Sequence, residues 1–170
     1  ESEDELNDSS VYHIARGFGA FLTKIGITER VVGNDSRATS ESFHDQAIKG
    51  LTESGINVVD IGTASTPMSY WSQFYLKVKG LFMITASHNP AGWNGIKLGT
   101  DLSKTLLTDD LQEVYSIIEK EEYVSGQGTV RKEEIFEAYK KDLLTRANIT
   151  KKFKVLVNTG NGTAGLFYPE

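Results

Sequence analysis

Helix-like and strand-like patterns alternate along this chain, and the alternation constrains its fold more than any other feature. Three apolar runs have the length and composition of buried strands, and the segment before each has apolar residues at helical spacing. The expected strands are residues 30–33, 56–61 and 80–84, and the expected helices are residues 9–25, 40–54 and 66–77. Short connections in this order are typical of helices packed on a largely parallel sheet. The sequence therefore predicts an α/β fold, a three-layer α/β/α sandwich with a mixed, largely parallel sheet.

The last third of the chain is less regular. Two more helices are expected at 108–118 and 135–143, and one more strand at 153–157, followed by the glycine-rich stretch Asn-Thr-Gly-Asn-Gly. A single strand with a loop has little to pair with. We therefore expect one domain over residues 1–150. Over residues 151–170 we expect the start of an incomplete second domain, either docked on the first or mobile.

Composition excludes several kinds of protein. The chain has no cysteine, which rules out a disulfide scaffold, a thiolate metal site and a cysteine nucleophile, and which fits a cytoplasmic location. Its net charge of -5 comes without a basic stripe, so we expect no nucleic-acid partner. No apolar run approaches the roughly 20 residues of a membrane span, and the acidic N-terminus lacks a signal pattern. We expect no membrane partner.

The residues that could carry chemistry follow the third expected strand. Residues 84–97 read Ile-Thr-Ala-Ser-His-Asn-Pro-Ala-Gly-Trp-Asn-Gly-Ile-Lys. In open α/β sheets, ligands bind beyond the carboxyl ends of the strands. Pro90 keeps Asn89 out of the helical region, so no helix begins there. We therefore expect Ser87 at the tip of a loop on the ligand-binding edge of the sheet.

Three interpretations of Ser87 remain open from the residues alone. A Ser–His hydrolase pair is disfavoured, because adjacent side chains at Ser87 and His88 point apart in an extended chain and no G-x-S-x-G elbow is present. A hydrogen-bonded loop without chemistry is the ordinary alternative. The third interpretation is a phosphorylated serine whose added negative charge is offset by nearby cations.

The loop resembles that of a known family. T-A-S-H-N-P at 85–90, followed by N-G-I-K at 94–97, closely resembles the active-site serine loop of the α-D-phosphohexomutase superfamily, which includes phosphoglucomutase, phosphomannomutase and phosphoglucosamine mutase. G-N-D-S-R at 33–37, the D-I-G and S-T-P motifs within 60–67, and N-T-G-N-G at 158–162 resemble further segments of the family. The resemblance covers nearly the whole chain and implies the N-terminal domain of a four-domain enzyme.

The resemblance implies a reaction. A hexose 1-phosphate and a hexose 6-phosphate would be interconverted through a bisphosphate, with Ser87 as the phosphoryl carrier and as one ligand of Mg²⁺. The other metal ligands would come from a D-x-D-x-D-R segment that this sequence lacks. The implied partners are hexose phosphate, hexose bisphosphate and the remaining domains of the same protein, and the chain alone is expected to be inactive. The phosphomannomutase/phosphoglucomutase type is favoured. A phosphoglucosamine mutase, or a non-catalytic domain that binds a phosphosugar or a partner, is the alternative.

Three more residues are carried over from the resemblance as catalytic candidates. His88 is either an acid or base near the transferred oxygen or a residue that orients the loop. Lys97 lies where the family places a cation near the phosphoserine. Arg37 suits a bidentate phosphate contact, and an ion pair with Asp35 is the alternative.

Other conspicuous side chains are expected to have structural roles. Asn89 and Asn94 would shape the loop through hydrogen bonds to backbone. His13 and His44 are expected at the surface or boundary of helices. The aromatic residues Trp71, Phe74 and Tyr75 are expected in the core.

Overall fold

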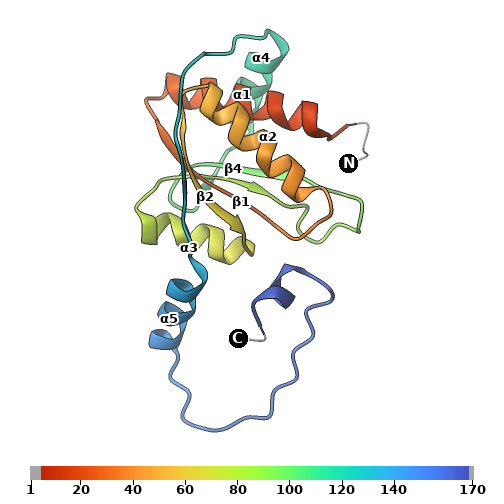
Figure 1. The fold of residues 1–170 in the computed structure, drawn as a ribbon, viewed down its shortest axis with the longest axis vertical. Coiled ribbons are helices and arrows are strands. Elements are labelled where there is room, and N and C mark those ends of the chain that lie inside the picture. The colour runs from red at the N-terminus through yellow and green to blue at the C-terminus, as the bar shows by residue number, and fades with distance from the viewer. Residues whose placement is uncertain (1–4, 169–170) are drawn as a thin grey trace.

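A six-stranded mixed sheet separates two layers of helices in the computed structural model, which describes residues 5–168 (Figure 1). The strands are β1 (Glu29–Asn34), β2 (Asn57–Thr63), β3 (Leu81–Ile84), β4 (Ile96–Asp101), β5 (Lys104–Thr105) and β6 (Val130–Lys132). Their order in the sheet is β5-β4-β3-β1-β2-β6. β1 pairs in parallel with β2 and β3, and β2 with β6, whereas β4 is antiparallel to β3 and β5. The predicted α/β fold with a mixed, largely parallel sheet is confirmed.

The helices cover both faces of the sheet. One face carries α1 (Asp8–Lys24) and α2 (Ser40–Glu53), with α4 (Thr108–Glu119) packed beside α1, and the other carries α3 (Thr66–Leu76) and α5 (Phe136–Arg146) (Figure 1). A single-turn 3₁₀ helix, η1 (Thr163–Leu166), follows near the C-terminus. None of the helices in the described range 5–168 is both long and apolar enough to cross a membrane.

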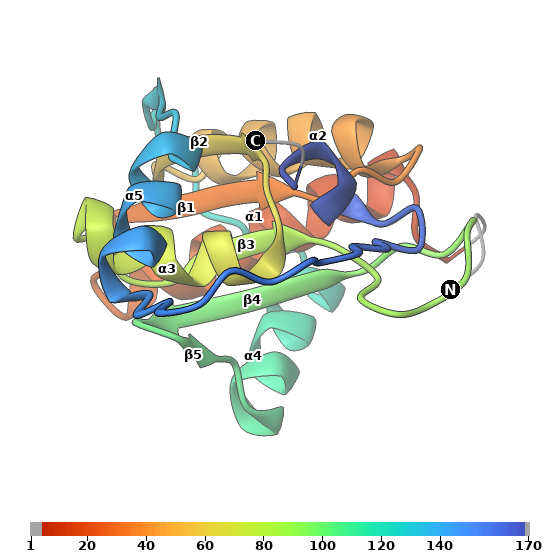
Figure 2. The same ribbon diagram turned by 90° about the horizontal axis from the view of Figure 1, so that it is seen from below.

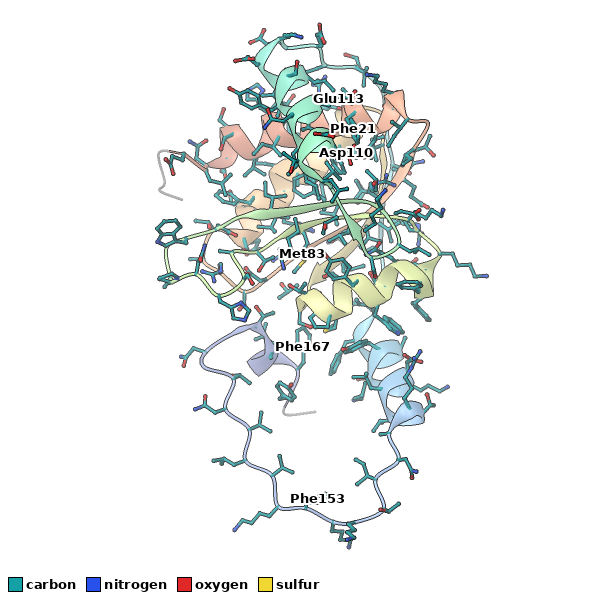
Figure 3. The ribbon with its side chains drawn as sticks, turned by 180° about the vertical axis from the view of Figure 1, so that it is seen from behind. Phe21, Met83, Asp110, Glu113, Phe153 and Phe167 are labelled. Atoms are coloured by element: carbon teal, nitrogen blue, oxygen red, sulfur yellow. The ribbon has the colours of Figure 1, made fainter. Side chains whose placement is uncertain are left out.

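Alternate residues of the central strands enter two separate cores. Val32, Val58, Phe82 and Ile84 pack under α1 and α2 with residues such as Phe21, whereas Val31, Val59, Leu81 and Met83 pack under α3 and the start of α5 (Figure 3). Successive strand side chains point to opposite faces, and here both faces are covered. This explains why the strands read as continuous apolar runs.

The carboxyl ends of β1 and β3 are adjacent, and this places the polar segments that follow them together. Asn34 pairs with Ile84 at the ends of these strands, and the Asp35 N–H donates to the Ile84 carbonyl oxygen at 2.9 Å. The chain leaves β1 through α2 to reach β2 on one side of β1, whereas β3 lies on the other side of β1. Ligands of open α/β sheets bind at such a point.

Two sequence predictions about local structure are wrong. No strand forms over residues 153–157, which extend away from the sheet with Leu156 96% exposed (Figure 3). Of the aromatic residues on α3 that were expected in the core, Trp71 packs against it, but Phe74 and Tyr75 are each more than half exposed. The chain does return to the first domain through η1, as one of the two expected outcomes for this segment.

Candidate functional site

The loop between β3 and β4 presents Ser87 to solvent. The Thr85 N–H donates to the Gly95 carbonyl oxygen at 2.9 Å and so closes the base of the loop. At its tip the Ser87 N–H donates to the Thr85 hydroxyl at 3.0 Å, and the Asn89 N–H donates to the Ala86 carbonyl oxygen at 3.1 Å. Ser87 has a φ of 57°, in the left-handed region that residues with a side chain seldom adopt. The chain therefore turns sharply at the exposed serine.

Ser87 and His88 form a hydrogen-bonded pair. The Ser87 Oγ lies 2.9 Å from His88 Nδ1, and both residues are exposed. The expectation that these neighbours point apart is wrong, because it assumed an extended backbone and Ser87 is left-handed. When the ring proton is on Nε2, Nδ1 accepts the hydroxyl hydrogen of the serine. The pair thus has the geometry in which an imidazole receives the proton of an oxygen nucleophile.

Arg37 holds the serine loop by its backbone. Its two terminal nitrogens donate to four carbonyl oxygens of the loop, those of Ser87 (3.3 Å), Asn89 (2.8 Å), Pro90 (2.8 Å) and Trp93 (3.0 Å). Its Nε donates to the Asp35 carboxylate at 3.2 Å. A guanidinium group has five N–H donors, and here all five have partners. Of the two roles open from the sequence, the ion pair with Asp35 is formed.

A buried polar network supports Arg37 from below. Asp35 also accepts from the Arg37 N–H at 3.1 Å and from the Ser40 hydroxyl. The Asn94 side chain donates to the Ser40 and Thr39 hydroxyl oxygens, at 3.0 and 2.9 Å, and accepts from the Gly95 N–H at 2.8 Å. Asn94 therefore ties the end of the serine loop to the start of α2, and Arg37 ties the rest of the loop to the segment before α2. Asn94 shapes the loop as expected.

The serine loop borders a cavity of about 970 Å³. Three further segments line it, namely residues 35–38 after β1, the start of α3 at Ser65–Pro67, and the glycine-rich segment Thr159–Ala164. Lys97 also lines it, and its β4 position is paired with Met83 on β3, so its side chain lies on the α3 side of the sheet. The side chain is half-buried and makes no hydrogen bond or ion pair with any residue in the described part of the chain.

A comparison with known proteins identifies this arrangement. Residues 1–125 match the family model described as "Phosphoglucomutase/phosphomannomutase, alpha/beta/alpha domain I". The chain belongs to the phosphoglucomutase/phosphomannomutase family. The matched range contains Ser87, His88, Lys97 and Arg37, and it confirms the resemblance inferred from the loop sequence.

Individual relatives agree with this family. The chain is 39% identical over 169 residues to a phosphomannomutase of Vibrio cholerae, and 34% identical over 167 residues to a phosphomannomutase/phosphoglucomutase of Pseudomonas aeruginosa. These alignments cover 95% and 98% of this chain and 36% of each relative. A solved phosphoglucomutase/phosphomannomutase family protein from Burkholderia thailandensis shares the fold, with a TM-score of 0.89 at 24% identity over 96% of this chain and 37% of that one. The chain thus spans about a third of the length of the relatives it matches.

A second cavity of this phosphohexomutase domain lies on the other side of Arg37. It measures about 470 Å³ and is lined by the carboxyl ends of β1, β2 and β6 and by one side of α2. Here His44 Nε2 lies 2.8 Å from the Asp60 carboxylate, which also accepts from the Gly62 N–H at 2.8 Å. Burial disfavours the charged form of Asp60, but these hydrogen bonds outweigh it and lower the pKa of the carboxyl. His44 is therefore buried and paired, not the surface residue that its helix position indicated.

The donor groups of this domain do not form a complete metal site. Within residues 5–168, no group of three or more His, Asp or Glu side chains is placed to hold a metal ion. The Asp35 carboxylate, on a residue that lines the same cavity as Ser87, is already bonded to Arg37 and Ser40. Ser87 is the one candidate ligand named by the sequence, and an uncharged hydroxyl is a weak ligand unless it carries a phosphate.

Proposed function

We propose that this chain is the serine-loop domain of a phosphohexomutase. In this proposal Ser87 carries the phosphoryl group while a hexose 1-phosphate and a hexose 6-phosphate are interconverted through a hexose bisphosphate. The observation that supports it best is the exposed Ser87 hydroxyl, hydrogen-bonded to His88 on a loop whose backbone is held by both terminal nitrogens of Arg37. The relatives named phosphomannomutase and phosphoglucomutase support the substrate class, with the phosphomannomutase/phosphoglucomutase type favoured.

The Ser87–His88 pair suits transfer in both directions. As the bond from Ser87 Oγ to phosphorus forms, the bond from phosphorus to the sugar oxygen breaks, and the serine proton passes to His88 Nδ1. The leaving sugar oxygen takes up a proton from water in the same step. The return transfer reverses each change, with His88 giving the proton back to Ser87. We therefore assign His88 the acid and base role, of the two left open by the sequence.

Lys97 and Arg37 divide the electrostatic and positioning tasks. A phosphoserine adds a charge of about −1.5 to −2 at neutral pH. The Lys97 ammonium group lines the cavity without another partner in the described range, so it can offset that charge. The N-terminus of the 11-residue α3 lines the same cavity and adds a favourable dipole. Arg37 has no free donor, so we assign it to positioning of the loop and not to phosphate binding.

The metal and the remaining partners belong to the same proposal. A phosphate on Ser87 would bring the anionic oxygen ligands that Mg²⁺ prefers, and the other ligands would come from outside residues 5–168. We propose that further domains of the same protein supply them, since the relatives are about three times as long. A cytoplasmic location is proposed from the cysteine-free sequence.

Intact-mass measurement tests the proposal. The complete protein that contains this chain is incubated with Mg²⁺ and a hexose 1,6-bisphosphate, and the expected result is an added mass of about 80 Da for one phosphoryl group. Ser87→Ala removes the adduct, whereas Ser125→Ala, at another exposed loop serine, keeps it. A protein that binds the bisphosphate but gains no mass would contradict the proposal and favour the non-catalytic binding domain.

A further inference from the structure

Two hydrogen bonds join Ser36, the residue before Arg37, to Thr163 near the end of the described chain. After the extended stretch that follows α5, the chain returns so that η1 lies beside the carboxyl end of β1 (Figure 2). There the Ser36 N–H donates to the Thr163 Oγ1 at 3.1 Å, and the two hydroxyl groups lie 3.0 Å apart. These residues are 127 positions apart in sequence. Both the backbone and the side chain of Ser36 are thus held by one threonine.

Ser36 lies between two residues whose side chains are fixed by other contacts. On one side Asp35 is buried and bonded to Ser40, and on the other Arg37 is bonded to the serine loop. Ser36 itself is exposed, and its side chain bonds to Thr163. The backbone at Ser36 sets the direction in which the Arg37 side chain leaves the sheet. A group that fixes Ser36 therefore also fixes where the guanidinium meets the loop carbonyl oxygens.

We propose that Thr163 is a positioning residue for the serine loop. It acts through Ser36 and Arg37, and it couples the glycine-rich segment at 158–165 to the conformation of Ser87 without touching Ser87 itself. The catalytic consequence rests on the function proposed above, whereas the coupling to the loop does not. The segment that carries Thr163 borders the same cavity as Ser87, so the coupling joins two walls of one cavity.

A separate contact keeps η1 in place when the threonine is changed. The rings of Phe167 and Phe136 lie with their centroids 5.0 Å apart, and both pack against the core under α3 and α5. Thr163→Val keeps the size and branching of the side chain and removes only the hydroxyl. The valine variant therefore tests the hydrogen bonds, while Phe167→Ala tests the docking of the whole segment.

Hydrogen–deuterium exchange of the 170-residue chain measures the coupling directly. Thr163→Val removes two hydrogen bonds of about 0.5–1.5 kcal/mol each. Because the loss reaches the serine loop only in part, through Ser36 and Arg37, we expect a roughly two- to tenfold change in the opening equilibrium of the loop. We expect amides of residues 85–95 to exchange faster by that factor in Thr163→Val, and by more in Phe167→Ala. Thr163→Ser keeps the hydroxyl and should restore the wild-type rate. Thr145→Val is the matched control, because that hydroxyl bonds only within α5, to the Asp142 carbonyl oxygen.

The outcomes separate this inference from the proposed function. Unchanged exchange of residues 85–95 in both Thr163→Val and Phe167→Ala would overturn the coupling, whether or not Ser87 is phosphorylated. Faster exchange in a protein whose Ser87 takes up no phosphate would keep the coupling and overturn the proposed function. If both hold, Thr163→Val in the complete protein lowers kcat for mutase turnover, Thr163→Ser restores it, and KM for the sugar phosphate changes little.

Discussion

The Arg37 guanidinium donates to the carbonyl oxygen of Asn89 at 2.8 Å, and this bond joins the end of β1 to the loop that carries Ser87. Asn89 is two residues beyond the serine, and Arg37 also donates to the carbonyl oxygens of Ser87, Pro90 and Trp93. Arginine is thus used here for its five fixed donors and not for its charge alone. The loop can present a serine in a left-handed conformation because its carbonyl oxygens are bonded from below.

Arg37→Lys is predicted to loosen the serine loop. A lysine keeps the charge but cannot reach four carbonyl oxygens in a fixed fork. We expect the free energy of unfolding to fall by about 1–3 kcal/mol and phosphorylation of Ser87 to slow by about 10- to 100-fold because the nucleophile is misplaced. Urea unfolding and time-resolved mass measurement check these values. Arg131→Lys, at an exposed arginine of β6, should change the free energy of unfolding by no more than about 0.5 kcal/mol. It should change the rate of Ser87 phosphorylation by no more than about twofold.

Asn94→Asp is predicted to destabilise the domain. The Asn94 amide is buried and donates to two hydroxyl oxygens, and a carboxylate cannot donate to either. It would also place a negative charge near the Asp35 carboxylate, through the shared Ser40 hydroxyl. We expect a loss of about 1–3 kcal/mol in urea unfolding. The same change at the exposed Asn148 serves as the control, and an equal effect at both positions would contradict the network.

Asp60 is predicted to make stability depend on pH in the acid range. Its pKa is lowered in the folded state from an ordinary value of 3.8, so its charged form stabilises the fold. This contribution is present above the unfolded-state pKa and is lost as pH falls through the folded-state pKa. We expect Asp60→Asn to destabilise the protein at neutral pH and the difference from wild type to shrink as pH falls below about 4. Glu121→Gln, at an exposed position beyond the end of α4, should show no such convergence.

Gly50→Ala is predicted to force α1 and α2 apart. A Cβ at Gly50 would lie 2.7 Å from the Ala15 Cβ and 2.8 Å from the Tyr12 carbonyl oxygen, closer than packed atoms allow. The helices can relieve this only by shifting, so we expect a loss of about 1–3 kcal/mol in thermal or urea unfolding. Gln46→Ala, one turn earlier on α2, is the control. A Gly50→Ala variant as stable as wild type would show that the helices separate at no cost.

Periodicity predicted the central elements because both faces of this sheet are covered. The runs around Val31, Val58 and Phe82 are apolar on both faces, which distinguishes them from loops. The three-residue strand β6 was missed, since Val130 and its neighbours are exposed and have no apolar pattern. The run at 153–157 has strand composition but no paired strand within the described residues, and composition alone does not supply a partner.

The sequence named the candidate residues of the site but did not predict their geometry. The loop motif named Ser87, His88 and Lys97, which line one cavity, but the Ser87–His88 contact depends on a backbone angle that no side-chain pattern reports. The contacts of Arg37 with the serine loop join positions 50 or more residues apart, and their acceptors are backbone atoms common to every residue. His44 was assigned to the surface because its partner Asp60 is 16 residues away and lies on another element. The available signal for this pairing was a polar residue on the inner side of a predicted helix, followed by a carboxylate near the end of the next strand.

A pulse-and-chase experiment tests whether Ser87 receives a phosphoryl group and returns it to a sugar. The complete protein that contains this chain is labelled with a ³²P-hexose 1,6-bisphosphate, and the labelled peptide is mapped before and after unlabelled hexose 1-phosphate is added. We expect one label per chain, on the peptide that contains Ser87, and the return of this label to hexose bisphosphate during the chase. Label on another residue, or label on Ser87 that hexose 1-phosphate does not remove, would contradict the proposed function.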